Sequence, residues 1–201
     1  MSTFRKGGSP PQRRADAERS IAAILDGAIR VLGTRPEASI GEIADAAGVT
    51  RQTVYAHFSS RETLINAVID RVTEEIVAAI DAAELDEGRP ASALLRFITT
   101  SWRTFERYPL LLHVSPASTE AERESLAPIL KRLERLVSRG KDEGAFDSRL
   151  STTWLIAATI ALAHAAGEEI GAGRMTSADA LEALQQSALR IFGITTTPEP
   201  P

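Results

Sequence analysis

The segment from Gly48 to Ile65, GVTRQTVYAHFSSRETLI, constrains the fold more than any other stretch of this chain. A glycine separates two short apolar patterns there. Six hydrogen-bonding side chains then crowd onto one short helix: Thr50, Arg51, Gln52, Thr53, Tyr55 and His57. A helix that is buried on all sides is normally apolar all round. The pattern therefore predicts a short helix that packs through one apolar side and presents its polar side to a partner.

Capping residues mark where the helices around this segment begin and end. Ser39 followed by Glu42 is a capping box, in which each side chain satisfies a free backbone N–H at a helix start. Gly48 stands where the chain has to turn, most simply with positive φ. Thr50 can then cap a helix over residues 51–57. These signals predict two short helices joined by a glycine turn.

Apolar residues recur with helical spacing through most of the remaining chain. We expect three helices in the first sixty residues, over 16–33, 40–47 and 51–57. A fourth should run from a Ser59–Glu62 capping box into the 80s, a fifth over 90–108, and a short sixth should end near 114. A seventh should start at a Thr119–Glu122 capping box, and the last two should cover 151–170 and 177–192. Pro128 should kink or restart the seventh of these. Because no strand alternation is present, the sequence predicts an all-α fold of about nine helices.

Composition limits the classes of protein that this chain can represent. It has 201 residues, of which 43% are hydrophobic, so it can bury a sizeable core. No apolar run approaches the roughly 18 to 20 residues that span a bilayer, and the start lacks a signal-peptide core. There is no cysteine, and the three histidines are scattered. We therefore expect a cytoplasmic protein with no membrane association, no cofactor and no metal site.

Charge is distributed unevenly along the chain, although the net charge is only -4. Residues 1–60 hold eight basic and six acidic residues, whereas the rest is acidic. Residues 1–14 contain Arg13 and Arg14 among glycines and prolines, so we expect a mobile basic arm. These arginines could reach DNA phosphates or could form an ordinary solvated tail. The asymmetry suggests a basic N-terminal module on an acidic body.

The stretch SIGEIADAAGVTRQTVYAHFSSRETLI resembles the DNA-binding segment of the TetR family of bacterial transcriptional regulators, with AGVT..TVY.HF.S.E.L as its most specific part. The resemblance implies a three-helix DNA-binding domain with a helix-turn-helix over residues 15–62. A larger helical ligand-binding and dimerisation domain would cover residues 63–194, and residues 195–201 would form a tail. It also implies a ligand-responsive repressor that binds a palindromic operator as a homodimer and leaves it when a small-molecule effector binds.

Residues of the recognition helix receive distinct roles from their chemistry. Arg51 and Gln52 can reach base edges, since arginine pairs with guanine and glutamine with adenine. The shorter or flatter donors Thr50, Thr53, Tyr55 and His57 suit phosphate oxygens, as Tyr and His in TVY.HF do in the family. His57 could instead be a capping or packing residue.

Two further residues are candidates for phosphate contacts. Arg61 stands at the start of the fourth helix, where free N–H groups attract phosphate, and family members commonly have lysine there. Ser39 could contact a phosphate, although capping alone explains it. The sequence leaves both readings of Ser39 open.

The body of the chain should dimerise, because a selective regulator reads two half-sites. The family resemblance implies that the body also holds a ligand. The expected dimer interface consists of two helical stripes: Ala157, Ala161, Ala165, Leu181, Leu184 and Ala188. The expected ligand pocket consists of Trp102, Phe105, His113 and His164. Both sets could instead be ordinary core.

Two other classes of protein remain as alternatives. A small helical enzyme would need a convergent catalytic set, and no metal spacing, phosphate loop or nucleophile motif is present. We therefore expect no enzymatic activity. A DNA-binding protein without a small-molecule effector is the second alternative, and a well-formed closed pocket would argue against it.

Overall fold

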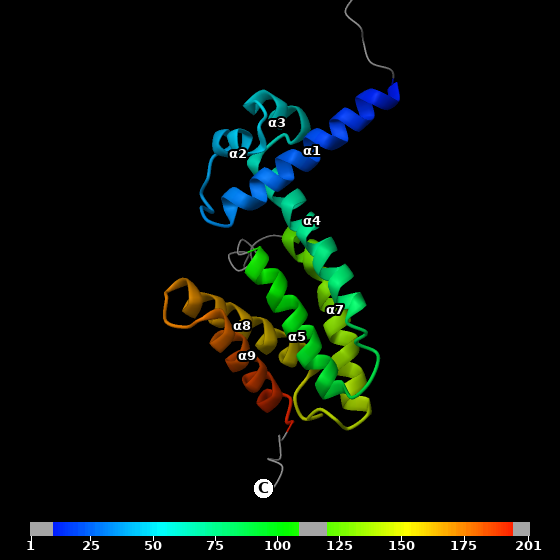
Figure 1. The fold of residues 1–201 in the computed structure, drawn as a ribbon. Helices are drawn as coiled ribbons and strands as arrows, with labels where there is room; N and C mark the ends of the chain where they lie inside the picture. Colours follow the sequence, from blue (N-terminus) through cyan, green and yellow to red (C-terminus); the bar gives the residue numbers. More distant parts are fainter. Residues whose placement is uncertain (1–9, 109–119, 195–201) are drawn as a thin grey trace, which may run out of the picture. The chain divides into compact units, whose positions relative to one another are not determined.

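The computed structural model describes residues 10–108 and 120–194, and every regular element in these residues is an α-helix. The helices, shown in Figure 1, are α1 (Pro10–Leu32), α2 (Ile40–Ala47), α3 (Arg51–His57), α4 (Arg61–Ala82), α5 (Pro90–Arg107), α7 (Glu120–Asp142), α8 (Thr152–Gly171) and α9 (Ser177–Ile191). The predicted all-α fold is confirmed.

Some expected helix boundaries differ from the observed ones. α1 begins at Pro10, inside the expected arm of residues 1–14. α7 runs as one helix through Pro128, so the restart considered there does not occur. Arg132 donates a hydrogen bond of 2.9 Å to the Pro128 carbonyl within this helix. The short helix ending near 114 and the Thr119 cap lie outside the described residues.

The chain divides into two compact units, residues 1–68 and 69–201. The boundary falls within α4, a few residues beyond the limit of 62 that we expected from the sequence. α1, α2, α3 and the start of α4 form the first unit. The remaining helices form the second.

The first unit is held together by the crossing of α1 and α2 (Figure 1). Ile24 and Ala28 of α1 and Ile43 of α2 are fully buried. Gly27 lies where the two helices approach, since a Cβ atom placed on it would lie 2.9 Å from both the Cβ and the backbone N of Ala47. The close crossing of α1 and α2 therefore depends on a residue without a side chain.

We expect Gly27→Ala to destabilise the protein, against the usual trend for helices. Alanine favours a helix over glycine by about 1 kcal/mol. Here the methyl group would press on backbone, and such overpacking costs about 1 to 3 kcal/mol. Gly41→Ala is the matched control in α2, because its Cβ would meet nothing closer than 3.6 Å. Urea unfolding should show a lower midpoint for Gly27→Ala and an equal or higher midpoint for Gly41→Ala.

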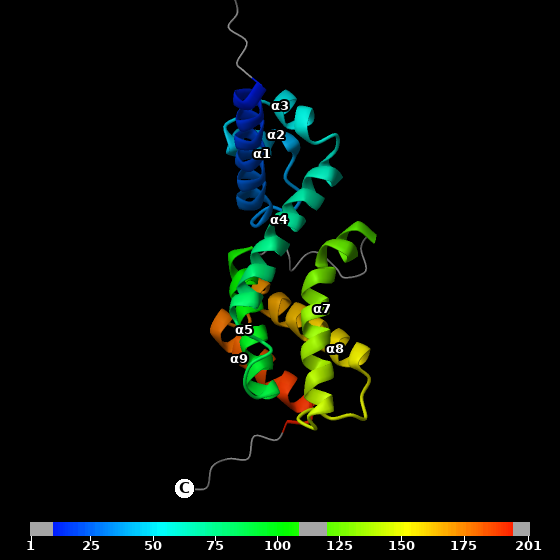
Figure 2. The same ribbon diagram turned by 90° about the vertical axis from the view of Figure 1, so that its right-hand side faces the viewer.

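The second unit is a helical bundle built around α5, as Figures 1 and 2 show. α5 contacts α7 and α9, while α8 contacts α7 and α9. The rings of Phe146 and Phe192 pack edge to face within this unit, with ring centroids 4.9 Å apart. In the part of the chain that the structure describes, no helix is long and apolar enough to cross a membrane.

Polar links join the second half of α4 to its neighbours in the bundle. Tyr108 donates a hydrogen bond of 2.5 Å to Glu75. Arg132 of α7 binds both carboxylate oxygens of Asp81 at 2.6 Å. Bidentate pairs of this kind fix direction as well as distance. These links give α4 a defined place against α5 and α7.

Candidate nucleic-acid interface and internal cavity

The turn between α2 and α3 is shaped by Gly48. Its φ of 69° and ψ of 27° lie in the left-handed region, as the sequence predicted. The Gly48 N–H donates to the carbonyls of Ala44 and Asp45, and the Val49 N–H donates to Ala44 at 3.0 Å. These bonds end α2 and turn the chain directly into α3. The two helices and this tight connection form a helix-turn-helix.

α3 has seven residues, too few to be stable alone, and its surroundings hold it in place. Thr50 caps it, because the Thr50 hydroxyl accepts a hydrogen bond of 3.1 Å from the Thr53 N–H. Val54 is fully buried and Phe58 is 7% exposed, so both anchor the helix to the first unit. The predicted cap and apolar side of α3 are confirmed.

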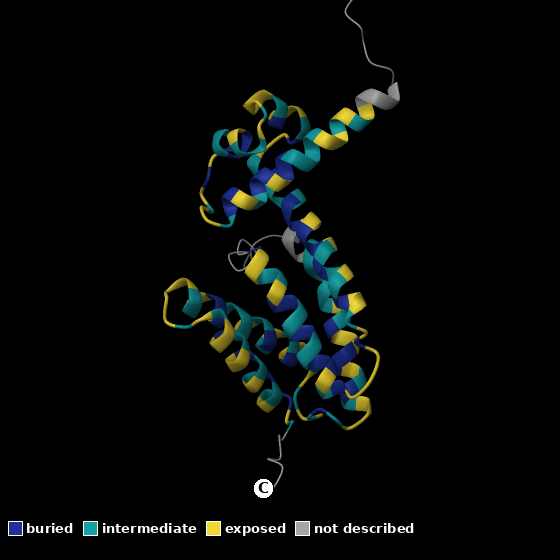
Figure 3. Ribbon diagram, viewed as in Figure 1, coloured by how far each residue is buried: buried dark blue, intermediate teal, exposed yellow. Residues whose placement is uncertain are grey.

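The opposite side of α3 faces outward, as the exposed positions over this helix in Figure 3 show. Thr50, Arg51 and Gln52 are exposed, and the Tyr55 side chain remains 49% exposed. Thr53 and His57 are half-buried, and the Thr53 hydroxyl lies 2.9 Å from the Thr50 hydroxyl. The first turn of α3 contains no acidic residue. This surface therefore presents a cation, an amide and hydroxyl groups together.

Ser39 is fully engaged as a cap at the start of α2. Its hydroxyl accepts from the Glu42 N–H at 3.3 Å, and its backbone N–H donates to the Glu42 carboxylate at 2.8 Å. The hydrogen bond from the Ser39 backbone lowers the pKa of Glu42, and the Ser39 hydroxyl and Arg35 add to this. This stabilisation is present above the usual carboxyl pKa and is lost as pH falls through the lowered pKa of Glu42.

Ser39 variants can separate capping from a phosphate contact. Ser39→Ala should lower the free energy of unfolding by about 1 kcal/mol, since the cap is lost. Ser39→Gly removes the hydroxyl at a cost of only a few tenths of a kcal/mol, because glycine is tolerated at a helix N-cap. If Ser39 is only a cap, Ser39→Gly should unfold nearly like the wild type and bind DNA nearly as well. A large loss of DNA affinity in a stable Ser39→Gly protein would reveal a phosphate contact.

Arg61 is turned toward its own unit. Its guanidinium donates to the carbonyls of Ala38, at 3.4 Å, and Pro36, so it ties the start of α4 to the loop before α2. Ser60 provides the cap of α4, because its hydroxyl accepts from the Thr63 N–H at 3.1 Å. The expected capping by Ser59 is therefore wrong by one residue. These contacts give Arg61 a structural role beside the phosphate contact predicted for it.

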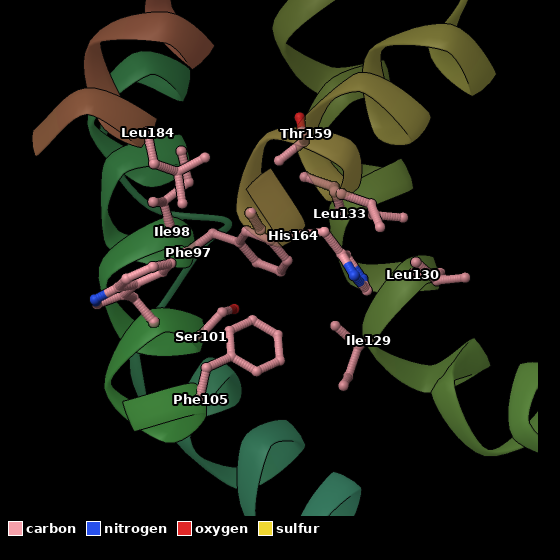
Figure 4. Close-up of a pocket in the computed structure, with 13 residues that line it drawn as sticks. Phe97, Ile98, Ser101, Phe105, Ile129, Leu130, Leu133, Thr159, His164 and Leu184 are labelled. Carbon is pink, nitrogen blue, oxygen red and sulfur yellow. The ribbon is translucent and has the colours of Figure 1, made fainter. Parts of the chain in front are cut away.

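A cavity of about 90 Å³ lies inside the second unit, between α5, α7, α8 and α9. Figure 4 shows its lining. Thirteen residues border it: Phe97, Ile98, Ser101, Trp102, Phe105, Ile129, Leu130, Leu133, Thr159, Ile160, Ala163, His164 and Leu184. Trp102, Phe105 and His164, which the sequence placed at a pocket, thus border one cavity. His113 lies outside the described residues.

Sequence reasoning missed most of this lining, including Phe97 and Ser101. These two residues and Phe105 recur at four-residue intervals, so they share one face of α5. This stripe, with one small polar residue between two aromatic residues, was the sequence signal that could have identified them as cavity lining. Trp102 is 2% exposed, and its indole N–H donates to the Ser177 hydroxyl at 3.0 Å. Trp102 is therefore a core residue as well as a wall of the cavity.

The predicted dimer residues of α8 are exposed. Ala157, Ala161 and Ala165 lie on one face of the helix, because their spacing of four residues is close to one turn. Trp154, one turn earlier, is 59% exposed and extends the same face. A contiguous exposed apolar patch often marks an interaction surface. α8 therefore offers an apolar surface with small residues at its centre.

The predicted dimer residues of α9 are placed differently. Leu181 is half-buried, but Leu184 is 5% exposed and Ala188 only 1% exposed. Leu184 borders the internal cavity. Their place in a dimer interface stays a prediction, but the Leu184 and Ala188 side chains are already buried within one copy of the chain. The reason is that this stripe of α9 packs on α5 and α8.

An all-helical chain whose N-terminal unit carries a helix-turn-helix with an exposed polar second helix has the build of a DNA-binding regulator. Comparison with known proteins agrees. Residues 24–68 match the family described as bacterial regulatory proteins, tetR family. The helix-turn-helix unit of this chain is thus similar to the DNA-binding segment of that family.

Two curated relatives share part of the sequence. The HTH-type transcriptional repressor LfrR of Mycolicibacterium smegmatis is 36% identical over 109 residues, which cover 54% of this chain and 57% of LfrR. The HTH-type transcriptional regulator EthR of the same organism is 30% identical over 131 residues, covering 62% of this chain and 59% of EthR. The chain thus spans little more than half of the length of these relatives.

The fold is shared over a longer stretch. The crystal structure of LfrR in complex with proflavine has a TM-score of 0.70 at 28% identity and covers 88% of this chain and 97% of that chain. FadR of Bacillus subtilis in complex with stearoyl-CoA has a TM-score of 0.70 at 18% identity, covering 87% and 98%. This second likeness concerns the fold alone.

Proposed function

We propose that the protein is a ligand-responsive transcriptional repressor that binds a palindromic operator as a dimer and is released from it by a small molecule. The observation that carries this proposal is α3 itself. Its apolar side is anchored by buried Val54, while its outer side presents Arg51, Gln52 and Tyr55 to solvent. A short helix with this division of sides suits the major groove of DNA.

Within this proposal, Arg51 and Gln52 read bases and their neighbours hold the backbone. Both side chains are exposed at the start of α3 and long enough to reach base edges. The hydroxyls of Thr50, Thr53 and Tyr55 suit phosphate oxygens, as does the imidazole of His57. Arg61 contributes by fixing the start of α4 and, through its remaining N–H groups, by contacting a phosphate. Ser39 contributes mainly as a cap.

The dimer is proposed to form through the exposed face of α8 that contains Trp154, Ala157, Ala161 and Ala165. Small residues at the centre of this face would let a helix of the second copy approach closely. The outer side of α9, on which Leu181 is partly exposed, can extend the interface. The symmetry of the dimer would then be mirrored in a palindromic operator.

The internal cavity is the proposed effector site. LfrR, the relative with the shared fold, has been crystallised in complex with proflavine, which supports a small-molecule effector for this chain. Leu133 of α7 borders the cavity, and its neighbour Arg132 holds Asp81 of α4. A ligand that displaces α7 would therefore act on α4, whose other end belongs to the DNA-binding unit. Coupling of this kind is typically worth about 1 to 3 kcal/mol.

The proposal is tested with the purified protein and the DNA upstream of its own gene. A gel-shift assay should show a complex, and a footprint should cover a palindrome. Compounds that bind the protein should then release this DNA. Specific DNA binding that no ligand of the cavity affects would favour the alternative of a DNA-binding protein without a small-molecule effector.

A further inference from the structure

The cavity wall includes a buried hydroxyl group that has no hydrogen-bond partner among the described residues. Ser101 is 7% exposed, and its Oγ atom makes no hydrogen bond to any group in the described residues. Thr159, also on the cavity wall, behaves in the usual way for a helix, since its hydroxyl donates to the Leu155 carbonyl at 2.8 Å. Buried polar groups are usually hydrogen-bonded, to protein or to water, so the Ser101 hydroxyl is available to bond with a ligand in the cavity.

The surroundings of Ser101 define the chemistry of that ligand. Figure 4 shows the Ser101 hydroxyl between the rings of Phe97 and Phe105, with the His164 ring on the opposite wall. Among the described lining residues, none is Asp, Glu, Lys or Arg. A cationic ligand would leave water without any counter-charge to receive it, and an anionic ligand would find only the His164 imidazole, so burial of a charged ligand is unfavourable. Aromatic walls suit a flat ring system.

Size sets a further limit. The cavity of about 90 Å³ is smaller than the cavity of about 150 Å³ that accommodates benzene in another protein. A ligand with one or two rings must therefore widen it, and the half-buried residues Phe105, Ile129 and Leu130 are the lining groups with room to move. Long chains and bulky charged groups do not fit such a space.

We infer that the effector is a compact, uncharged aromatic molecule whose single hydroxyl or carbonyl group bonds to Ser101. This inference rests on the proposed function, because it assigns a ligand class to the proposed effector site.

Three matched probes test the inference: 2-naphthol, naphthalene and 2-naphthylmethylamine, which is a cation at neutral pH. Binding to the full-length protein is measured by equilibrium dialysis without DNA. We expect 2-naphthol to bind at least about tenfold more tightly than the cationic amine. Ser101→Ala should weaken 2-naphthol about threefold to tenfold, as expected for one lost hydrogen bond, while naphthalene binding stays nearly unchanged. Thermal melting of Ser101→Ala shows whether its fold is intact.

A second variant locates the site. Ala163→Leu fills the cavity and should abolish binding of both neutral probes. The inference is overturned if the amine binds as tightly as 2-naphthol, if Ser101→Ala weakens both neutral probes equally, if Ala163→Leu leaves binding intact, or if no probe binds. Operator binding is measured separately by gel shift. Loss of the proposed function would appear as absent DNA binding, whereas failure of the inference would appear only in the probe affinities.

Discussion

Ala161→Glu should convert the proposed dimer into a monomer. Ala161 is exposed in a single copy of the chain, so the substitution leaves the protomer fold intact. In the proposed interface each copy would bury an unpaired carboxylate close to its symmetry mate. Burying one such group costs several kcal/mol, and a cost of about 3 to 4 kcal/mol weakens association by roughly two to three orders of magnitude. Affinity for a palindromic operator should fall as the dimer dissociates.

Sedimentation equilibrium measures this effect directly. Ala82→Glu is the matched control, because Ala82 is an exposed alanine at the end of α4, outside the proposed interface. The control should remain a dimer with wild-type thermal stability. A dimer of unchanged affinity in the Ala161→Glu protein would place the interface on another surface of the chain.

Arg51→Ala and Gln52→Ala should change which DNA sequence is preferred. If each side chain makes a bidentate contact with one base, its removal costs about 1 to 3 kcal/mol at that base pair and relaxes the choice there. Tyr55→Ala should instead weaken binding to every sequence by a similar factor, because a phosphate contact carries no sequence information. Melting temperatures should stay close to the wild type, since Arg51, Gln52 and Tyr55 are exposed.

Selection of binding sites from a random duplex library separates these outcomes. The Arg51→Ala and Gln52→Ala proteins should each lose preference at one position of a half-site, and the Tyr55→Ala protein should keep the wild-type consensus at lower affinity. An unaltered consensus for Arg51→Ala would show that Arg51 reads no base.

Local signals predicted the DNA-binding unit well. The Ser39–Glu42 capping box, the positive φ of Gly48 and the Thr50 cap are each determined by residues within one turn of the chain, so the sequence contains all that is needed. Ser59 and Ser60 show the limit of this reasoning. Either of two adjacent serines can cap a helix. In the structure the Ser60 hydroxyl accepts the hydrogen bond from the Thr63 N–H, so the helix begins one residue later than expected.

Contacts between distant segments could not be predicted in the same way. An apolar stripe such as that of Leu184 and Ala188 shows only that one side of a helix is covered. It does not show whether the same chain or a second copy covers it. The need for Gly27 depends on the approach of α2, and the isolation of the Ser101 hydroxyl depends on three other helices. Such features appear only when the helices are packed.

In the proposed function, α3 binds duplex DNA in a sequence-specific manner, once from each copy of a dimer. The most direct measurement is a binding-site selection with the wild-type protein, followed by a footprint on the selected duplex. We expect a palindromic consensus whose half-sites lie about 34 to 36 Å apart, or a multiple of one helical turn. Selection of a single unsymmetrical site, or of no consensus, would contradict it.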